Sequence, residues 1–131
     1  MTNSLDAITV MIVDDHEMVR RGACSYLEAQ PDISVVAQAG SGEEAVKLAQ
    51  EFIPDVVLMD LVMPEMGGQA LFHAMRQRGL KLPLVLLTGH PMENELRSLQ
   101  AQGLAGWLLK PLNVEQLSHL LAQVLKEKRL I

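Results

Sequence analysis

Short apolar runs alternate with amphipathic segments along the chain, and this alternation restricts the fold more than any other feature. Five runs of five to seven residues are rich in branched aliphatic side chains, which is typical of strands buried on both faces of a sheet. They span 8–13, 33–39, 55–59, 82–87 and 105–109. Each run therefore predicts one buried strand.

A segment with apolar residues at helical spacing follows each predicted strand. These segments span 17–29, 41–52, a stretch that contains 70–75 and ends before Gly79, 92–102 and 114–128. Regular alternation of strand and helix predicts an α/β fold, in which right-handed crossovers join parallel strands and helices cover both faces of the sheet.

The length and composition are those of one globular domain. A chain of 131 residues can bury a core of its own without disulfides or a structural metal. Hydrophobic residues make up 49% and charged residues 21% of the sequence, values far from those of disordered chains. We expect a single domain over 1–131, with its core in 8–128.

Charge and cysteine content exclude several functional classes. The net charge of −5 argues against direct contact with nucleic acid, which depends on clustered Lys and Arg. Cys24 is the only cysteine, so an internal disulfide and a cysteine-based zinc site are excluded, and we expect a buried free thiol in the reducing cytoplasm. The sequence has no signal-peptide pattern and no apolar run of ~20 residues, so no membrane segment is expected.

Polar side chains gather where four of the five predicted strands end. Asp14 and Asp15 follow the first strand, Asp60 the third, Thr88 the fourth and Lys110 the fifth. Because parallel strands end at the same edge of a sheet, these side chains should converge there. Three carboxylates repel one another, and Mg²⁺, which prefers oxygen ligands, would relieve that repulsion. The sequence therefore predicts a Mg²⁺ site at this edge.

Each of these residues has an ordinary explanation when it is taken alone. An acidic pair before a helix is often a cap, and Asp60 and Thr88 could serve turns at strand ends. Lys110 alone carries almost no information. Their joint occurrence at four strand ends is what favours a functional site, because ligands of open α/β sheets bind there.

The segments around these positions resemble the receiver domain of bacterial two-component response regulators. The resemblance is carried by Val13-Asp14-Asp15-His16, Met59-Asp60-Leu61-Val62-Met63-Pro64, Leu87-Thr88-Gly89 and Leu109-Lys110-Pro111. It covers 8–126 and implies a flavodoxin-like, doubly wound fold of five strand–helix units, with strand order 2-1-3-4-5.

The resemblance also implies what the acidic residues do. Asp60 would accept a phosphoryl group from a sensor histidine kinase or a phosphotransfer protein in a phosphorelay. Mg²⁺ would be held by Asp14, Asp15 and Asp60, together with the backbone carbonyl of Val62. Lys110 and Mg²⁺ would neutralise the phosphoryl oxygens during the transfer.

A switch is implied as well. Thr88 would bind the new phosphoryl group and move inward, and Trp107, at the aromatic switch position of the family, would turn to fill the vacated space. A lone Trp near a strand end is also common as simple packing.

The resemblance further implies a signalling domain that does not act as an enzyme on a separate substrate. The chain would catalyse only its own Mg²⁺-dependent phosphorylation and dephosphorylation. A weak homodimer is left open.

The two halves resemble different receivers. Residues 8–67 are similar to receivers of DNA-binding regulators with a helix-turn-helix output, and 82–125 are similar to receivers attached to hybrid sensor kinases. An excised domain, a stand-alone receiver and a recombined chain all remain open.

Other functional classes fit the sequence less well. A haloacid dehalogenase-type phosphatase also uses a strand-end aspartate and Mg²⁺, but it would need a second aspartate two residues later, and His16 and Glu17 follow Asp15. No dinucleotide or P-loop glycine pattern follows a strand. A degenerate receiver that only binds partners is disfavoured by the complete set of site residues. His16 and His90 are interpreted as loop residues, since Mg²⁺ prefers oxygen.

Overall fold

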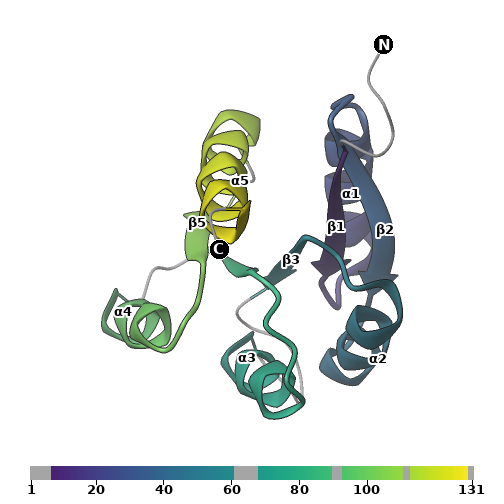
Figure 1. The fold of residues 1–131 in the computed structure, drawn as a ribbon. Helices are drawn as coiled ribbons and strands as arrows, with labels where there is room; N and C mark the ends of the chain where they lie inside the picture. The colour runs from purple at the N-terminus through teal and green to yellow at the C-terminus, as the bar shows by residue number, and fades with distance from the viewer. Residues whose placement is uncertain (1–6, 61–67, 90–92, 111–112, 130–131) are drawn as a thin grey trace.

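A parallel sheet of five strands forms the centre of the computed structural model, which describes residues 7–60, 68–89, 93–110 and 113–129. The strand order is β2-β1-β3-β4-β5, so the predicted flavodoxin-like order is confirmed (Figure 1). The strands are β1 (Ile8–Val13), β2 (Ile33–Ala39), β3 (Val56–Asp60), β4 (Leu84–Thr88) and β5 (Gly106–Leu109).

Helices cover both faces of the sheet, as the alternating pattern predicted. They are α1 (Glu17–Glu28), α2 (Gly42–Phe52), α3 (Gly68–Gln77), α4 (Glu93–Ala101) and α5 (Val114–Arg129). Helices α1 and α5 pack on one face, and α2, α3 and α4 pack on the other. Among the described residues, no helix is both long and apolar enough to cross a membrane.

The sheet separates two hydrophobic cores, and β3 serves both of them. Val56 and Leu58 pack with α1 and α5, whereas Val57 and Met59 pack with the helices of the opposite face. Side chains of a strand point alternately to its two faces, so a strand buried on both faces must be apolar throughout. Polar chemistry is thereby confined to the strand ends.

The fourth strand begins two residues later than the sequence suggested. Leu82 is buried, as expected of the predicted strand, but the strand itself starts at Leu84. Pro83 has no N–H to donate to a neighbouring strand, although its carbonyl accepts a hydrogen bond from the Val57 N–H at 2.9 Å. The strand also extends one residue further, so Thr88 is its last residue.

Cys24 is the buried free thiol that the sequence predicted. It packs from α1 into the core shared with α5. Burial raises the pKa of the Cys24 thiol above its usual value, and the carboxylate of Glu28 raises it further. The thiol is therefore protonated and unreactive at neutral pH.

Helix α2 is well defined at its start and strained at its end. The Ser41 hydroxyl caps the helix by accepting a hydrogen bond from the Glu44 N–H, and Glu44 Oε1 accepts one from the Gly40 N–H in the preceding loop. After the last helical residue, Ile53 adopts a left-handed conformation with φ of 45°. Left-handed backbone costs an ordinary residue about 1–2 kcal/mol, and a β-branched side chain makes it worse.

Ile53→Gly should therefore stabilise the protein. Its side chain is 64% exposed, so little packing is lost. Relief of the strain should exceed the entropy cost of a new glycine, leaving a gain of about 0.5–1 kcal/mol in the free energy of unfolding. Phe52→Gly, the matched control at the last residue of α2, should instead destabilise by about 0.5–1 kcal/mol, because glycine has a low helix propensity and no strain is relieved there. Urea unfolding of the three proteins measures both changes, and an unfolding midpoint below native for Ile53→Gly would contradict the prediction.

Candidate functional site

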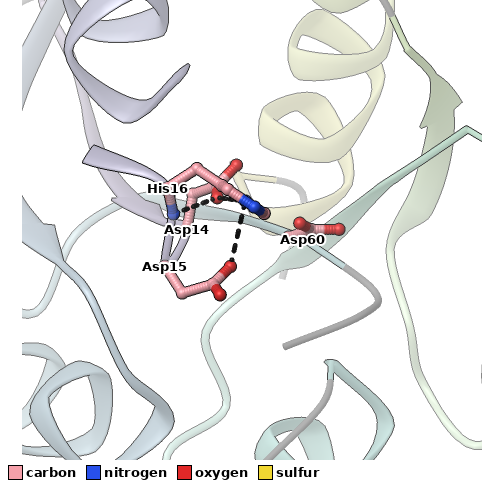
Figure 2. A group of neighbouring side chains, drawn as sticks. All are labelled: Asp14, Asp15, His16 and Asp60. Carbon is pink, nitrogen blue, oxygen red and sulfur yellow. Dashed lines mark hydrogen bonds and ion pairs between the residues drawn. The ribbon is translucent and has the colours of Figure 1, made fainter. Parts of the chain in front are cut away.

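The three predicted aspartates lie together at the carboxyl edge of the sheet. One ligand atom from each of Asp14, Asp15, His16 and Asp60 lies within 4.8 Å of the others (Figure 2). Asp14 and Asp60 are buried, with only 3% and 6% of their surfaces exposed. The convergence expected from the strand ends is therefore present.

Asp14 is held where β1 turns into α1. Its N–H donates a hydrogen bond to the Ala39 carbonyl at 3.1 Å, at the end of the pairing between β1 and β2. Its Oδ1 accepts a hydrogen bond from the His16 N–H at 2.8 Å, an aspartate turn that directs the chain into the helix. Asp14 thus has the local turn role as well as a place in the acidic cluster.

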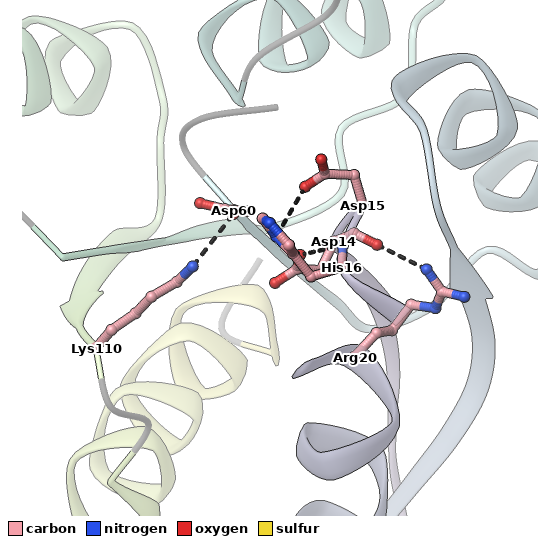
Figure 3. Close-up of polar contacts among 6 residues, drawn as sticks. All are labelled: Asp14, Asp15, His16, Arg20, Asp60 and Lys110. Carbon is pink, nitrogen blue, oxygen red and sulfur yellow. Dashed lines mark hydrogen bonds and ion pairs between the residues drawn. The ribbon is translucent and has the colours of Figure 1, made fainter. Parts of the chain in front are cut away.

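Lys110 lies against the buried aspartate of β3. Its Nζ is 3.2 Å from Asp60 Oδ2, and the Lys110 side chain is about one-third exposed (Figure 3). The Lys110 N–H donates to the Thr88 carbonyl at 2.8 Å, which continues the pairing of β4 with β5. The ammonium group supplies positive charge to a carboxylate that has little access to water.

Thr88 and Trp107 occupy neighbouring strands beside this cluster. Thr88 is buried at the end of β4 and faces Leu109 in the register, while Trp107 pairs with Leu86 two residues earlier. The Trp107 ring is half-buried and packs against the core that α2, α3 and α4 cover. Val62, the proposed carbonyl ligand, and His90 lie outside the described residues.

Asp15 is the aspartate of the cluster whose hydrogen bonding is least complete. Its Oδ1 is buried and has no hydrogen-bond partner among the described residues, although His16 Nδ1 approaches to 3.2 Å. A buried oxygen without a hydrogen bond is costly, and so is the repulsion among three carboxylates. A hard divalent cation that takes oxygen ligands would relieve both costs. The residues present therefore fit Mg²⁺.

Two contacts of the site were not predicted from the sequence. The His16 ring is 67% exposed, yet its Nδ1 lies 3.3 Å from Asp14 Oδ1. Arg20 Nη1 donates a hydrogen bond to the Asp14 carbonyl at 2.7 Å (Figure 3). The only signal for the second contact was the position of Arg20 just over one helical turn after the acidic pair.

Comparison with known proteins agrees with this geometry. Residues 10–122 match the family described as response regulator receiver domain. The transcriptional regulatory protein LiaR of Bacillus subtilis (strain 168) is 44% identical over 106 residues, which cover 79% of this chain and 49% of LiaR. The nitrate/nitrite response regulator protein NarL of Escherichia coli (strain K12) is 34% identical over 115 residues, which cover 88% of this chain and 53% of NarL. The chain thus spans about half the length of these curated relatives.

Solved structures show the same fold. The signal receiver domain of the putative response regulator NarL from Mycobacterium tuberculosis superposes with a TM-score of 0.78 at 30% identity, covering 92% of this chain and 95% of that one. A receiver domain protein from Clostridium thermocellum gives a TM-score of 0.85 at 22% identity, covering 94% and 98%, and shows the fold alone.

Mg²⁺ should stabilise the native protein by binding this cluster. At a Mg²⁺ concentration a hundred times the dissociation constant, the free energy of unfolding should rise by about 2.7 kcal/mol. Asp15→Asn should lose most of that gain, yet be at least as stable as the native protein without metal, because one like charge is removed. Asp32→Asn, an exposed control at the opposite sheet edge, should keep the full gain. Urea unfolding with and without Mg²⁺ tests this, and equal Mg²⁺ stabilisation of native and Asp15→Asn protein would contradict it.

Proposed function

The chain belongs to the response regulator receiver domain family, which serves phosphorylation-based signalling, and on this basis we propose that Asp60 is its phosphoryl acceptor. The observation that carries the proposal is the setting of Asp60. Its buried carboxylate has Lys110 at 3.2 Å on one side and the acidic pair that follows β1, Asp14 and Asp15, within 4.8 Å on the other (Figure 3). A carboxylate nucleophile for phosphoryl transfer needs such surrounding positive charge and metal ligands.

The proposed reaction transfers a phosphoryl group from a phosphorylated histidine of a sensor kinase or phosphotransfer protein. An oxygen of Asp60 forms the new bond to phosphorus as the phosphorus–nitrogen bond breaks, and the leaving imidazole takes up a proton. Lys110 is already paired with Asp60 Oδ2, so its ammonium group can also neutralise the negative charge of the phosphoryl oxygens. Hydrolysis of the acyl phosphate by water returns the Asp60 carboxylate and inorganic phosphate.

Asp14, Asp15 and Asp60 are the proposed Mg²⁺ ligands, with the backbone carbonyl of Val62 as a fourth. When bound, Mg²⁺ would supply charge neutralisation to the transferred group. The buried Oδ1 of Asp15 supports this assignment because, in the part of the chain that the structure describes, it accepts no hydrogen bond and only the His16 ring lies near it, at 3.2 Å. The chain's own contribution is to hold three carboxylates at one point, against their repulsion, before the metal arrives.

Thr88 and Trp107 form the proposed relay. The Thr88 hydroxyl would donate a hydrogen bond to a phosphoryl oxygen, drawing the end of β4 toward Asp60. Trp107 lies on the adjacent strand, and its half-buried ring would repack as that strand end moves. Phosphorylation would thereby favour a second conformation whose surface near β5 differs from that of the resting state.

The same residues indicate the role of the protein in a signalling pathway. It acts on no separate substrate, since the only groups that react are its own Asp60 and the donor's phosphohistidine. LiaR and NarL are named as regulators and are about twice the matched length. We therefore place this receiver between a sensor histidine kinase and a regulatory output.

Asp60→Asn should abolish phosphorylation. With Mg²⁺ and acetyl phosphate, the native protein should gain the mass of one phosphoryl group, and EDTA should prevent this. Asp60→Asn should gain none, because the amide is no nucleophile toward phosphorus, while Asp32→Asn should behave as native. Intact-mass spectrometry and peptide mapping decide the matter, and a phosphoryl group mapped to Asp14 or Asp15 would show that the roles are wrongly assigned.

Trp107 should report the relay. It is the only tryptophan, so its emission should change when acetyl phosphate is added with Mg²⁺. Thr88→Val should still be phosphorylated on Asp60 but should lose most of that change, because no hydroxyl reaches the phosphoryl group. An unchanged emission in native protein that mass spectrometry shows to be phosphorylated would rule out the proposed relay.

A further inference from the structure

We propose that Arg20 is a positioning residue of the Mg²⁺ site, which holds the Asp14–Asp15 peptide so that both carboxylates face Asp60. This inference rests on the proposed function. Among the described residues, Arg20 contacts neither the side chains of the proposed metal ligands nor the reacting atoms. It acts through the backbone carbonyl of Asp14.

The contact reaches from the first turn of α1 back to the end of β1. Arg20 N–H donates to the His16 carbonyl at 2.9 Å, so its backbone is part of the helix. Its side chain then extends toward the sheet, where Nη1 donates to the Asp14 carbonyl at 2.7 Å (Figure 3). This short bond to a charged donor is of the stronger kind.

Both main-chain groups of Asp14 are consequently held by different elements. The N–H is bound to Ala39 of β2, and the carbonyl is bound to Arg20 of α1. The peptide that joins Asp14 to Asp15 is planar. The orientation of the Asp14 carbonyl therefore also determines the orientation of the N–Cα bond of Asp15. Fixing the Asp14 carbonyl therefore fixes the starting point of the Asp15 side chain.

Asp15 depends on this more than Asp14 does. Asp14 Oδ1 has its own hydrogen bond from the His16 N–H, whereas Asp15 Oδ1 has no hydrogen bond among the described residues and only the exposed His16 ring near it, at 3.2 Å. The orientation of Asp15 is then determined by the backbone that carries it. Arg20 controls that backbone from the side opposite the carboxylate cluster.

Gly40 provides the space that the guanidinium occupies. A Cβ built on this glycine would lie only 3.1 Å from Arg20 Nη1, closer than ordinary packing allows. The Gly40 N–H is itself hydrogen-bonded to Glu44 Oε1, and this bond holds the loop between β2 and α2 beside the arginine. Arg20 Nε is buried without a hydrogen-bond partner in the described part of the chain. The guanidinium thus donates from Nη1 to the Asp14 carbonyl, while its Nε makes no hydrogen bond among the described residues.

The charge of Arg20 cannot explain a contribution to metal binding. A permanent positive charge near a Mg²⁺ site repels the ion, so removing the charge alone should tighten binding. If Arg20 acts through geometry, its removal should have the opposite sign. Loss of affinity on removing a cation is therefore diagnostic of positioning.

The experiment measures Mg²⁺ dissociation constants by calorimetry for native protein, Arg20→Met, Gly40→Ala, the double variant and Arg21→Met. Arg20→Met should weaken Mg²⁺ binding about tenfold, the usual cost of losing a residue that supports a ligand. Gly40→Ala should weaken it less, because the methyl group displaces Nη1 while the charge stays. The double variant should be no weaker than Arg20→Met, since both changes break the same contact.

Arg21→Met is the matched control. Arg21 is the next residue, is exposed, and pairs with Glu17 at 2.7 Å on the helix surface. Its replacement removes the same charge without touching the Asp14 carbonyl, so Mg²⁺ affinity should not fall. Arg20→Lys, which keeps a donor and the charge, should recover part of the affinity lost in Arg20→Met.

The rate of phosphorylation by acetyl phosphate separates positioning from a general loss of structure. In Arg20→Met the half-saturating Mg²⁺ concentration should rise while the plateau rate stays near native, because excess metal compensates for weak binding.

Equal dissociation constants for Arg20→Met and Arg21→Met would overturn the inference, whatever happens to stability. If Arg20→Met does not fold, native affinity in Gly40→Ala overturns it. Native protein that binds no Mg²⁺ would instead overturn the proposed function, and the inference with it.

Discussion

A parallel sheet with helices on both faces leaves only the ends of its strands for polar chemistry, and the site of this protein follows from that constraint. Strands such as β3 and β4 are buried along their whole length, so a charged side chain within them would have no partner and no water. At the carboxyl edge the strands diverge, and the last residue of each can be polar. Asp60 and Thr88 are the last residues of β3 and β4. The same burial that stabilises the sheet therefore concentrates the polar groups at one edge.

Collecting three carboxylates at one edge creates repulsion, which the surrounding residues offset unequally. Asp60 has an ammonium group at 3.2 Å, and Asp14 has a backbone N–H on its Oδ1. Asp15 has a buried oxygen that accepts no hydrogen bond among the described residues and has only the exposed His16 ring near it, at 3.2 Å. This unequal compensation is what a cation-dependent site requires, because full compensation by the protein would leave nothing for a metal to gain. The arrangement also explains why a residue such as Arg20 can matter without touching the cluster: it holds the backbone, and the repelling carboxylates keep their places.

Much of the fold could be predicted because burial on two faces leaves a strong pattern in the sequence. The apolar runs identified all five strands, and the residue types at the strand ends identified the acidic cluster and Lys110. Boundaries were less accurate where a single residue changes the hydrogen bonding, as Pro83 does at the start of β4. The left-handed conformation of Ile53 was not predictable either, because nothing in the residue type favours it; the chain imposes it after α2.

The sequence by itself determined the fold class, the strand ends that carry the chemistry, and the resemblance to receivers, because each depends on residue type and spacing alone. Only the tertiary structure decided which groups offset which charge. Arg20 and Gly40 are twenty residues apart, and neither residue type suggests the other, yet the packing of α1 beside β2 brings a guanidinium to 3.1 Å from where a Cβ on Gly40 would lie. Such contacts are determined by how the helices pack on the sheet, and packing depends on all the buried side chains together.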